Sequence, residues 1–195
     1  MTSPPQPPHR RPLVTVFGAA SPPVSLLPHA EAIGRGLVQA GCRVLTGGRT
    51  GVMEAVSRGA RTAPDAFDGC IIALLPGLDA SEANEWADIV IPTGIGLARN
   101  ALVAAAGDVV IAVGGGSGTL SEVAYAWQFG KPIVALDVGE GWSAKLAGLQ
   151  LDHRREDAIL RASSAEEAVQ LAVAAIGERR ALAWDLAGPG PARKS

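Results

Sequence analysis

A run of apolar residues at 109–113, most of them β-branched, leads directly into a glycine-rich loop and then into a helix pattern. The loop, residues 114–119, reads GGGSGT. Glycine has no Cβ, so a ligand can approach its backbone N–H groups closely. The first turn of a helix adds unpaired N–H donors and the positive end of the helix dipole. A strand, a glycine loop and a helix N-terminus in this order predict a binding site for an anion, usually a phosphate.

Strand patterns and helix patterns alternate along the rest of the chain. Strands are predicted at 13–17, 43–45, 70–75, 87–91, 108–113 and 133–137, and helices at 29–40, 51–63, 97–106, 119–129 and 164–176. Most of the strands are continuous apolar runs, which is typical of strands buried on both faces of a parallel sheet. The alternation predicts an α/β fold, a single Rossmann-like domain with a doubly wound parallel sheet flanked by helices.

The length of 195 residues fits one domain with a full hydrophobic core. We expect a disordered Pro-rich leader at 1–12, the Rossmann-like domain at 13–187 and a disordered tail at 188–195. The net charge of -2 gives no electrostatic reason to expect nucleic acid or an anionic membrane as a partner. No apolar stretch reaches the ~20 residues of a membrane span.

The cysteines and histidines do not suggest a metal site. Cys42 and Cys70 lack CxxC spacing, so we expect buried free thiols in a reducing cytoplasm. The histidines, His9, His29 and His153, are scattered along the chain. We therefore predict no metal, no resident cofactor and a cytoplasmic location.

Two further loops follow predicted strands and contain small or polar residues. One runs from Gly18 to Ser21, and the other, residues 46–51, reads TGGRTG. Because the carboxyl ends of parallel strands meet at one edge of the sheet, these loops and the loop at 114–119 predict a crevice for a ligand with phosphate and sugar parts. Gly47 and Gly48 taken alone are equally consistent with a tight turn.

Three charged residues beside these loops each allow two interpretations. Glu122 can form a capping box with Thr119, which its spacing favours, or it can act as a carboxylate at the phosphate pocket. Arg99 in the first turn of a predicted helix opposes the helix dipole, which hints at a ligand or a carboxylate partner, although a solvated surface arginine fits too. Arg49 can reach a phosphate or lie on the surface.

Common nucleotide and hydrolase motifs are absent. The sequence contains no GxxxxGK[ST] and no GxSxG. The dinucleotide fingerprint is only partly matched, because Thr119 stands where the third glycine belongs, although Asp137 follows the next strand where a ribose-binding acid would lie.

The two glycine motifs resemble those of the LOG (lonely guy) superfamily of Rossmann-like proteins, long mislabelled as lysine decarboxylases. The segments GGGSGTLSE at 114–122 and GGRTGVM at 47–53 are similar to its PGGxGTxxE and GGxxGxM motifs. The likeness runs from about Val14 to Asp137, and Ala83, Asn84 and the segment GLARN at 96–100 look like the branch that contains molybdenum-cofactor carrier proteins. Gly114 replaces the first proline of the motif, which weakens a transfer of cytokinin-specific activity.

The resemblance implies a function and roles for individual residues. LOG enzymes hydrolyse the N-glycosidic bond of cytokinin riboside 5′-monophosphates, and their catalytic arginine and glutamate fall on Arg99 and Glu122. A carboxylate would stabilise the positive charge that builds on the ribose as the bond breaks. The resemblance also implies a homodimer or a higher homo-oligomer. The residues expected to bind the ligand or its phosphate are Gly18, Ala19, Ser21, Gly47, Gly48, Arg49, Met53, Asn100, Gly115, Gly116, Ser117, Gly118 and Thr119.

Two functions follow as alternatives. The first is a nucleoside 5′-monophosphate phosphoribohydrolase that releases the free base and ribose 5-phosphate. The second is a non-catalytic carrier or sensor of a phosphorylated ligand such as the molybdenum cofactor, whose pterin also bears a phosphate. The expected partner is a small phosphorylated molecule in either case, a nucleoside monophosphate or a pterin phosphate.

Overall fold

The computed structural model describes residues 10–187, with side chains described up to residue 178. The predicted tail at 188–195 and the first nine residues of the predicted leader lie outside the described residues. Arg10 pairs with Asp108, and the guanidinium of Arg11 lies 4.0 Å from the centroid of the Phe67 ring. These two arginines therefore contact the folded domain.

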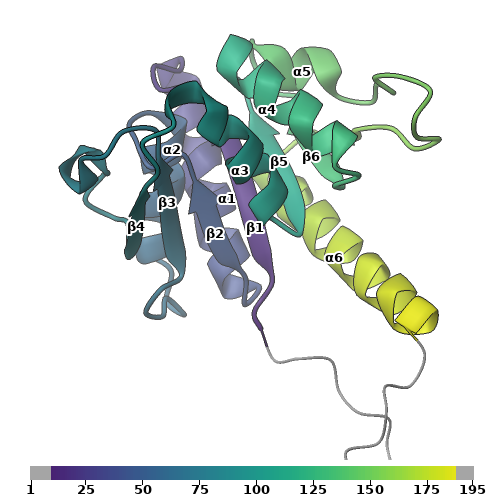
Figure 1. The fold of residues 1–195 in the computed structure, drawn as a ribbon, viewed down its shortest axis with the longest axis horizontal. Helices are drawn as coiled ribbons and strands as arrows, with labels where there is room; N and C mark the ends of the chain where they lie inside the picture. The colour runs from purple at the N-terminus through teal and green to yellow at the C-terminus, as the bar shows by residue number, and fades with distance from the viewer. Residues whose placement is uncertain (1–9, 188–195) are drawn as a thin grey trace, which may run out of the picture.

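The strands form one sheet in which every pair is parallel, as predicted (Figure 1). Its order is β4-β3-β2-β1-β5-β6-β7. The strands are β1 (Leu13–Gly18), β2 (Arg43–Thr46), β3 (Ile71–Leu75), β4 (Ile89–Pro92), β5 (Val109–Val113), β6 (Ile133–Leu136) and β7 (Leu160–Ala162). Strands β2, β3 and β4 follow one another on one side of β1, and β5, β6 and β7 follow one another on its other side. The strand order therefore reverses between β1 and β5, and sheets of this kind bind ligands at the carboxyl ends of the strands at this switch point.

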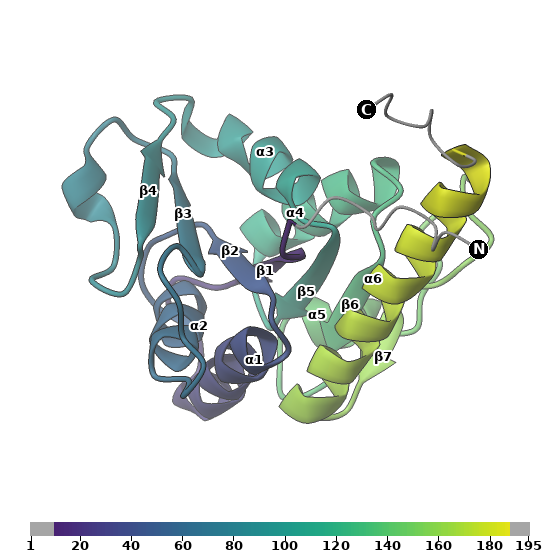
Figure 2. The same ribbon diagram turned by 90° about the horizontal axis from the view of Figure 1, so that it is seen from below.

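Helices cover both faces of the sheet, so the fold is a Rossmann-like α/β domain (Figure 2). One face packs against α1 (Leu27–Gln39), α2 (Val52–Arg61) and α6 (Ala165–Ala187), and the other packs against α3 (Arg99–Ala106), α4 (Ser117–Gln128) and α5 (Trp142–Leu146). Short 3-10 helices are η1 (Val24–Leu26), η2 (Ala80–Glu82) and η3 (Gly96–Ala98). In the described part of the chain, no helix combines the length and apolar character that crossing a membrane requires.

Burial of the strands follows their place in the sheet. Every residue of β5 and β6 is buried, because helices cover both sides of these inner strands. The edge strand β4 instead leaves Ile89 and Ile91 exposed. The continuous apolar run at 109–113 is thus explained by its central position, directly beside β1.

The helix boundaries correct one prediction about the site. Helix α4 begins at Ser117, its N-cap is Gly116, and no side chain caps it. The capping box between Thr119 and Glu122 is therefore wrong, since Thr119 already lies inside the helix. The structure also contains α5 and β7, which the sequence patterns did not predict. At the start of α6, the backbone nitrogen of Glu167 donates to Ser164 Oγ at 3.1 Å.

Candidate functional site

A cavity of about 390 Å³ opens at the carboxyl ends of β1, β2 and β5, where the three predicted loops meet. The predicted site residues that line it are Gly18, Ala19, Gly47, Arg49, Met53, Arg99, Asn100, Gly116, Ser117, Gly118, Thr119 and Glu122. Ser21, Gly48 and Gly115 do not line it. The topology thus assembles segments that are far apart in the sequence around one space.

The glycine loop leaves the N-terminus of α4 open toward the cavity. Gly115 has a φ of 94°, and a Cβ there would lie 2.2 Å from Thr119 Oγ1, so this position requires glycine. A Cβ on Gly116 or on Gly118 would meet no atom within 4 Å, because both face open space. Since α4 has no side-chain cap, its first backbone N–H groups are available to a ligand. The positive end of the α4 dipole favours an anion at the same place.

Helix α5 holds the glycine loop from behind. The backbone nitrogens of Trp142 and Ser143 donate to the carbonyls of Gly115 and Gly114, each at 3.0 Å. Gly114 N donates to Ser143 Oγ at 2.7 Å, and that buried hydroxyl donates to the carbonyl of Leu136, also at 2.7 Å. The carbonyls of the loop are therefore bound away from the cavity. Ser143 was missed by sequence reasoning because it follows the loop by almost thirty residues.

The second glycine loop, after β2, is held by a residue outside the cavity. Gly48 has a φ of 77°, and a Cβ there would lie 2.7 Å from the Cβ of Ala73. The carbonyl of Gly48 accepts from Asn84 N at 2.8 Å and from Asn84 Nδ2 at 3.0 Å. Asn84 Nδ2 also donates to the carbonyl of Arg49 at 3.1 Å. Gly48 and Asn84 therefore fix the shape of the loop from which Gly47 and Arg49 reach the cavity.

Arg99 is buried against this second loop. Arg99 is the first residue of α3, and only 8% of its surface is exposed. A Cβ on Gly47 would lie 2.3 Å from Arg99 Nη1 and 2.7 Å from Met53 Sδ, so the absence of a side chain at Gly47 makes room for the guanidinium. Arg99 Nε and Nη1 are buried and have no hydrogen-bond partner in the part of the chain that the structure describes. The alternative of a solvated surface arginine is therefore wrong.

Glu122 reaches the cavity from the second turn of α4. Its Oε1 lies 3.8 Å from Arg99 Nη1, which is an ion pair too long for a direct hydrogen bond. Burial raises the pKa of Glu122 to about 7, although the charge of Arg99 opposes that rise. Burial also lowers the pKa of Arg99. A carboxyl group with this pKa exchanges protons readily near neutral pH, and its ionised form can stabilise a developing positive charge.

Asn100 connects α3 to α4 at the edge of the cavity. Its Nδ2 donates to Ser121 Oγ at 2.9 Å, and that hydroxyl donates to the carbonyl of Gly118 at 2.7 Å. Asn100 is buried, with 6% of its surface exposed. This chain of bonds sets the position of the first turn of α4 relative to Arg99.

Arg49 and Ser21 lie at the outer side of the site. The side chain of Arg49 is about half exposed, and its Nη2 lies 3.7 Å from Glu82 Oε2. Ser21 is exposed and does not line the cavity. Ala20, from the predicted loop at 18–21, also lines the cavity. Further apolar residues complete the wall, and sequence reasoning missed them because they carry no polar signal: Val16, Phe17, Pro76 and Leu97.

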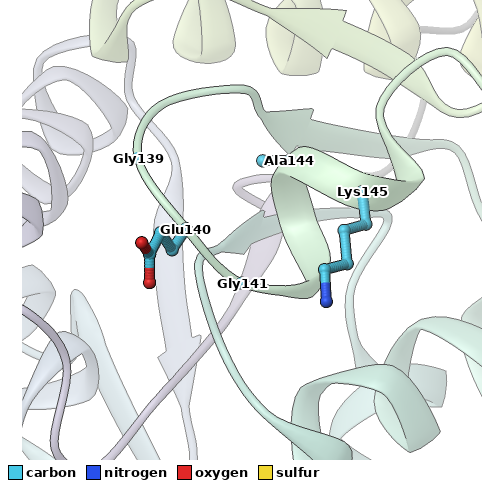
Figure 3. Close-up of a pocket in the computed structure, with 5 residues that line it drawn as sticks. All are labelled: Gly139, Glu140, Gly141, Ala144 and Lys145. Atoms are coloured by element: carbon cyan, nitrogen blue, oxygen red, sulfur yellow. The ribbon is translucent and has the colours of Figure 1, made fainter.

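A second hollow of about 440 Å³ lies beside α5 and has none of these properties. It is lined by Gly139, Glu140, Gly141, Ala144 and Lys145. Figure 3 shows the side chains of Glu140 and Lys145 on either side of Gly141, and both residues are exposed. Because this hollow has no buried polar group, the cavity with Arg99 and Glu122 is the candidate site. Within the described residues, no three His, Cys, Asp or Glu side chains come together in a group that could hold a metal ion.

Comparisons with known proteins identify a family and similar solved structures. A model of the SLOG cluster4 family matches residues 11–169. A molybdenum cofactor binding protein from Rippkaea orientalis is 35% identical, with a TM-score of 0.72 over 84% of this chain and 96% of its own. The molybdenum cofactor carrier protein from Chlamydomonas reinhardtii is 32% identical, with a TM-score of 0.71 over 88% and 99% of the two chains. An uncharacterised protein from Archaeoglobus fulgidus is 38% identical over 107 residues, 55% of this chain and 68% of its own.

Proposed function

This chain belongs to the SLOG cluster4 family, and from that premise we propose that it is a carrier of a small phosphorylated ligand of the molybdenum-cofactor kind. One observation carries the proposal. The uncapped N-terminus of α4 and the unpartnered N–H groups of Arg99 line the same cavity, so both offer donors to an anion. The likeness to two proteins that are described as binding or carrying the molybdenum cofactor favours a pterin phosphate as the cargo.

In this proposal the phosphate is bound by the backbone nitrogens of residues 116–119. The open space in front of Gly116 and Gly118 is wide enough for backbone N–H groups to meet an oxyanion directly. Met53, Pro76 and Leu97 supply apolar surface in the same cavity for the organic part of the ligand. No side chain of this set needs to react for the protein to act as a carrier.

The pair formed by Arg99 and Glu122 favours a second candidate, an N-glycosidic hydrolase that acts on nucleoside 5′-monophosphates. With a pKa of about 7, a substantial fraction of Glu122 is ionised at neutral pH. An ionised carboxylate near the anomeric carbon would stabilise the positive charge of the ribose, and a water molecule would complete the hydrolysis. Arg99 would orient that carboxylate or contact the phosphate.

Two measurements on the same preparation separate these candidates. The protein is incubated with AMP, CMP, GMP and an isoprenoid-adenosine monophosphate, and free base is quantified by chromatography. Separately, it is mixed with pterin phosphate and passed through a gel-filtration column, and the retained pterin is measured by fluorescence. A carrier retains pterin and releases no base. Base release that disappears in Glu122→Gln supports the hydrolase, and neither retention nor release contradicts both candidates.

A matched pair of glycine variants tests the location of binding. In Gly116→Val the new side chain projects into open space in front of α4, so we expect the retained pterin to fall sharply. Gly177 also has open space around the position of a Cβ, but it lies on α6 at the far end of the chain and outside the cavity. Gly177→Val is therefore expected to retain pterin as the unmodified protein does. Equal retention by all three proteins would contradict binding at α4.

We also propose that the protein assembles as a homodimer through the outer face of α3 and α4. The only charged residues of these two helices, Arg99 and Glu122, are buried. The exposed side chains include Leu102, Tyr125 and Phe129, and the rings of the last two stack with centroids 6.0 Å apart. An uncharged apolar face can pack against its own copy without charge repulsion, and such a patch on a surface is a mark of an interface.

A further inference from the structure

The cavity has two separate groups of donors for anions. One is the N-terminus of α4 with its uncapped N–H groups. The other is formed by Arg99 and Arg49, which come from α3 and from the loop after β2. Burial is the main cause of the lowered pKa of Arg99, and the nearby charge of Arg49 adds to it. Both groups line the same cavity, so one ligand there can contact both.

The charge of Arg99 is poorly balanced by the side chains around it. Its only ion-pair partner in the described structure is Glu122, at 3.8 Å, and burial keeps the pKa of that carboxyl at about 7. Part of the Glu122 population is therefore neutral at physiological pH. Two nitrogens of the guanidinium, Nε and Nη1, have no acceptor among the described residues. A buried cation in this state gains strongly from an anionic ligand, because leaving it unpaired is costly.

Arg49 is held near this position by a weak partner. Its ion pair with Glu82 spans 3.7 Å, and the two side chains are 51% and 41% exposed. Exposed pairs of this length contribute little to stability, so Arg49 can leave Glu82 at small cost. The backbone beneath Arg49 is nevertheless fixed, since its carbonyl accepts from Asn84 Nδ2. The guanidinium is therefore tethered at the cavity and free to change its partner.

From these observations, and resting on the proposed function, we infer that the ligand carries two anionic groups, at least one of them a phosphate. One group binds the backbone N–H groups of α4, and the other binds Arg49 and Arg99. Arg49 is then a residue that determines specificity, and Glu82 competes with the second anionic group of the ligand for the guanidinium of Arg49.

Calorimetry with two probes tests this inference. AMP has one anionic group, whereas adenosine 3′,5′-bisphosphate has the same base and sugar with two. We expect the unmodified protein to bind the bisphosphate at least about tenfold more tightly, because a hydrogen bond to a charged group is worth that much. Arg49→Gln should remove most of this preference, because it weakens binding of the bisphosphate far more than binding of AMP. Glu82→Gln should strengthen binding of the bisphosphate, since the competing carboxylate is gone.

Arg35→Gln is the matched control. Arg35 is also a half-exposed arginine paired with a glutamate, Glu31, but it lies in a different surface hollow. This variant should keep the full preference for the bisphosphate. If the unmodified protein binds AMP but binds the bisphosphate no better, or if Arg49→Gln weakens both probes equally, the inference is overturned and the proposed phosphate site stands. If the protein binds neither probe nor pterin phosphate, both are overturned.

Discussion

Replacing Glu122 with glutamine should change how the stability of the protein depends on pH. In the folded state burial raises the pKa of Glu122 from 4.5 to about 7. The folded protein therefore binds a proton at Glu122 more tightly than the unfolded chain does. Stability from this group is greatest below the unfolded pKa and is lost as the pH rises from 4.5 to about 7. Glutamine resembles the protonated side chain at every pH, so the variant lacks this loss.

The size of the effect follows from the shift. A rise of about 2.5 pKa units at about 1.4 kcal/mol per unit gives about 3 kcal/mol. Glu122 is only 7% exposed, so solvent screens this figure little. The difference between the free energy of unfolding of Glu122→Gln and that of the unmodified protein should increase by about 3 kcal/mol from about pH 4 to about pH 8. All other titrating groups are shared by the two proteins and cancel in this difference.

Urea unfolding followed by circular dichroism at both pH values measures this difference. Glu140→Gln, at an exposed glutamate outside the candidate site, controls for the general effect of removing a negative charge. If the unmodified protein and Glu122→Gln lose stability in parallel as the pH rises, the reasoning about a buried carboxyl with a raised pKa is refuted.

Three other changes have expected outcomes. Gly47→Ala should weaken binding of AMP or pterin phosphate at least about tenfold in calorimetry, because its Cβ would lie 2.3 Å from Arg99 Nη1 and displace the guanidinium; unchanged affinity would mean that Arg99 does not contact the ligand. Asn84→Ala removes the bonds from Nδ2 to the carbonyls of Gly48 and Arg49 and should lower the free energy of unfolding by about 1–2 kcal/mol in urea; no loss would contradict a role in holding the loop. Tyr125→Glu places a charge on the apolar face of α3 and α4, and light scattering should report a monomer, whereas a persistent dimer would place the interface elsewhere.

The sequence was sufficient to predict the parallel sheet and the loops that meet at its edge. Continuous apolar runs such as that of β5 can be recognised in the sequence itself. Because the strands of a parallel sheet share one carboxyl edge, these runs also predict where the loops that follow them meet. The glycines of the loop after β5 were informative too: Gly114 and Gly115 have positive φ angles, and Gly116 and Gly118 face open space. The misfit of Arg99 with the dipole of α3 left a partner and a solvated surface position open, and only its burial beside Glu122 decides between them.

What the sequence could not reveal depends on contacts between distant segments. The spacing of Thr119 and Glu122 matched a capping box, but α4 begins two residues before Thr119 and the carboxylate turns to Arg99 instead. Ser143 supports the glycine loop from α5, a helix of five residues that is too short to give a periodic pattern. Asn84 supports the other loop across a gap of thirty-six residues.

The central claim is that an oxyanion binds the exposed backbone N–H groups at the start of α4. A crystal structure of the protein soaked with saturating AMP or pterin phosphate tests it most directly. We expect phosphate oxygens within about 3.2 Å of the backbone nitrogens of residues 116–119, with Arg99 beside the ligand. A phosphate bound elsewhere, or a cavity that stays empty in these crystals, would contradict the claim and both proposed functions with it.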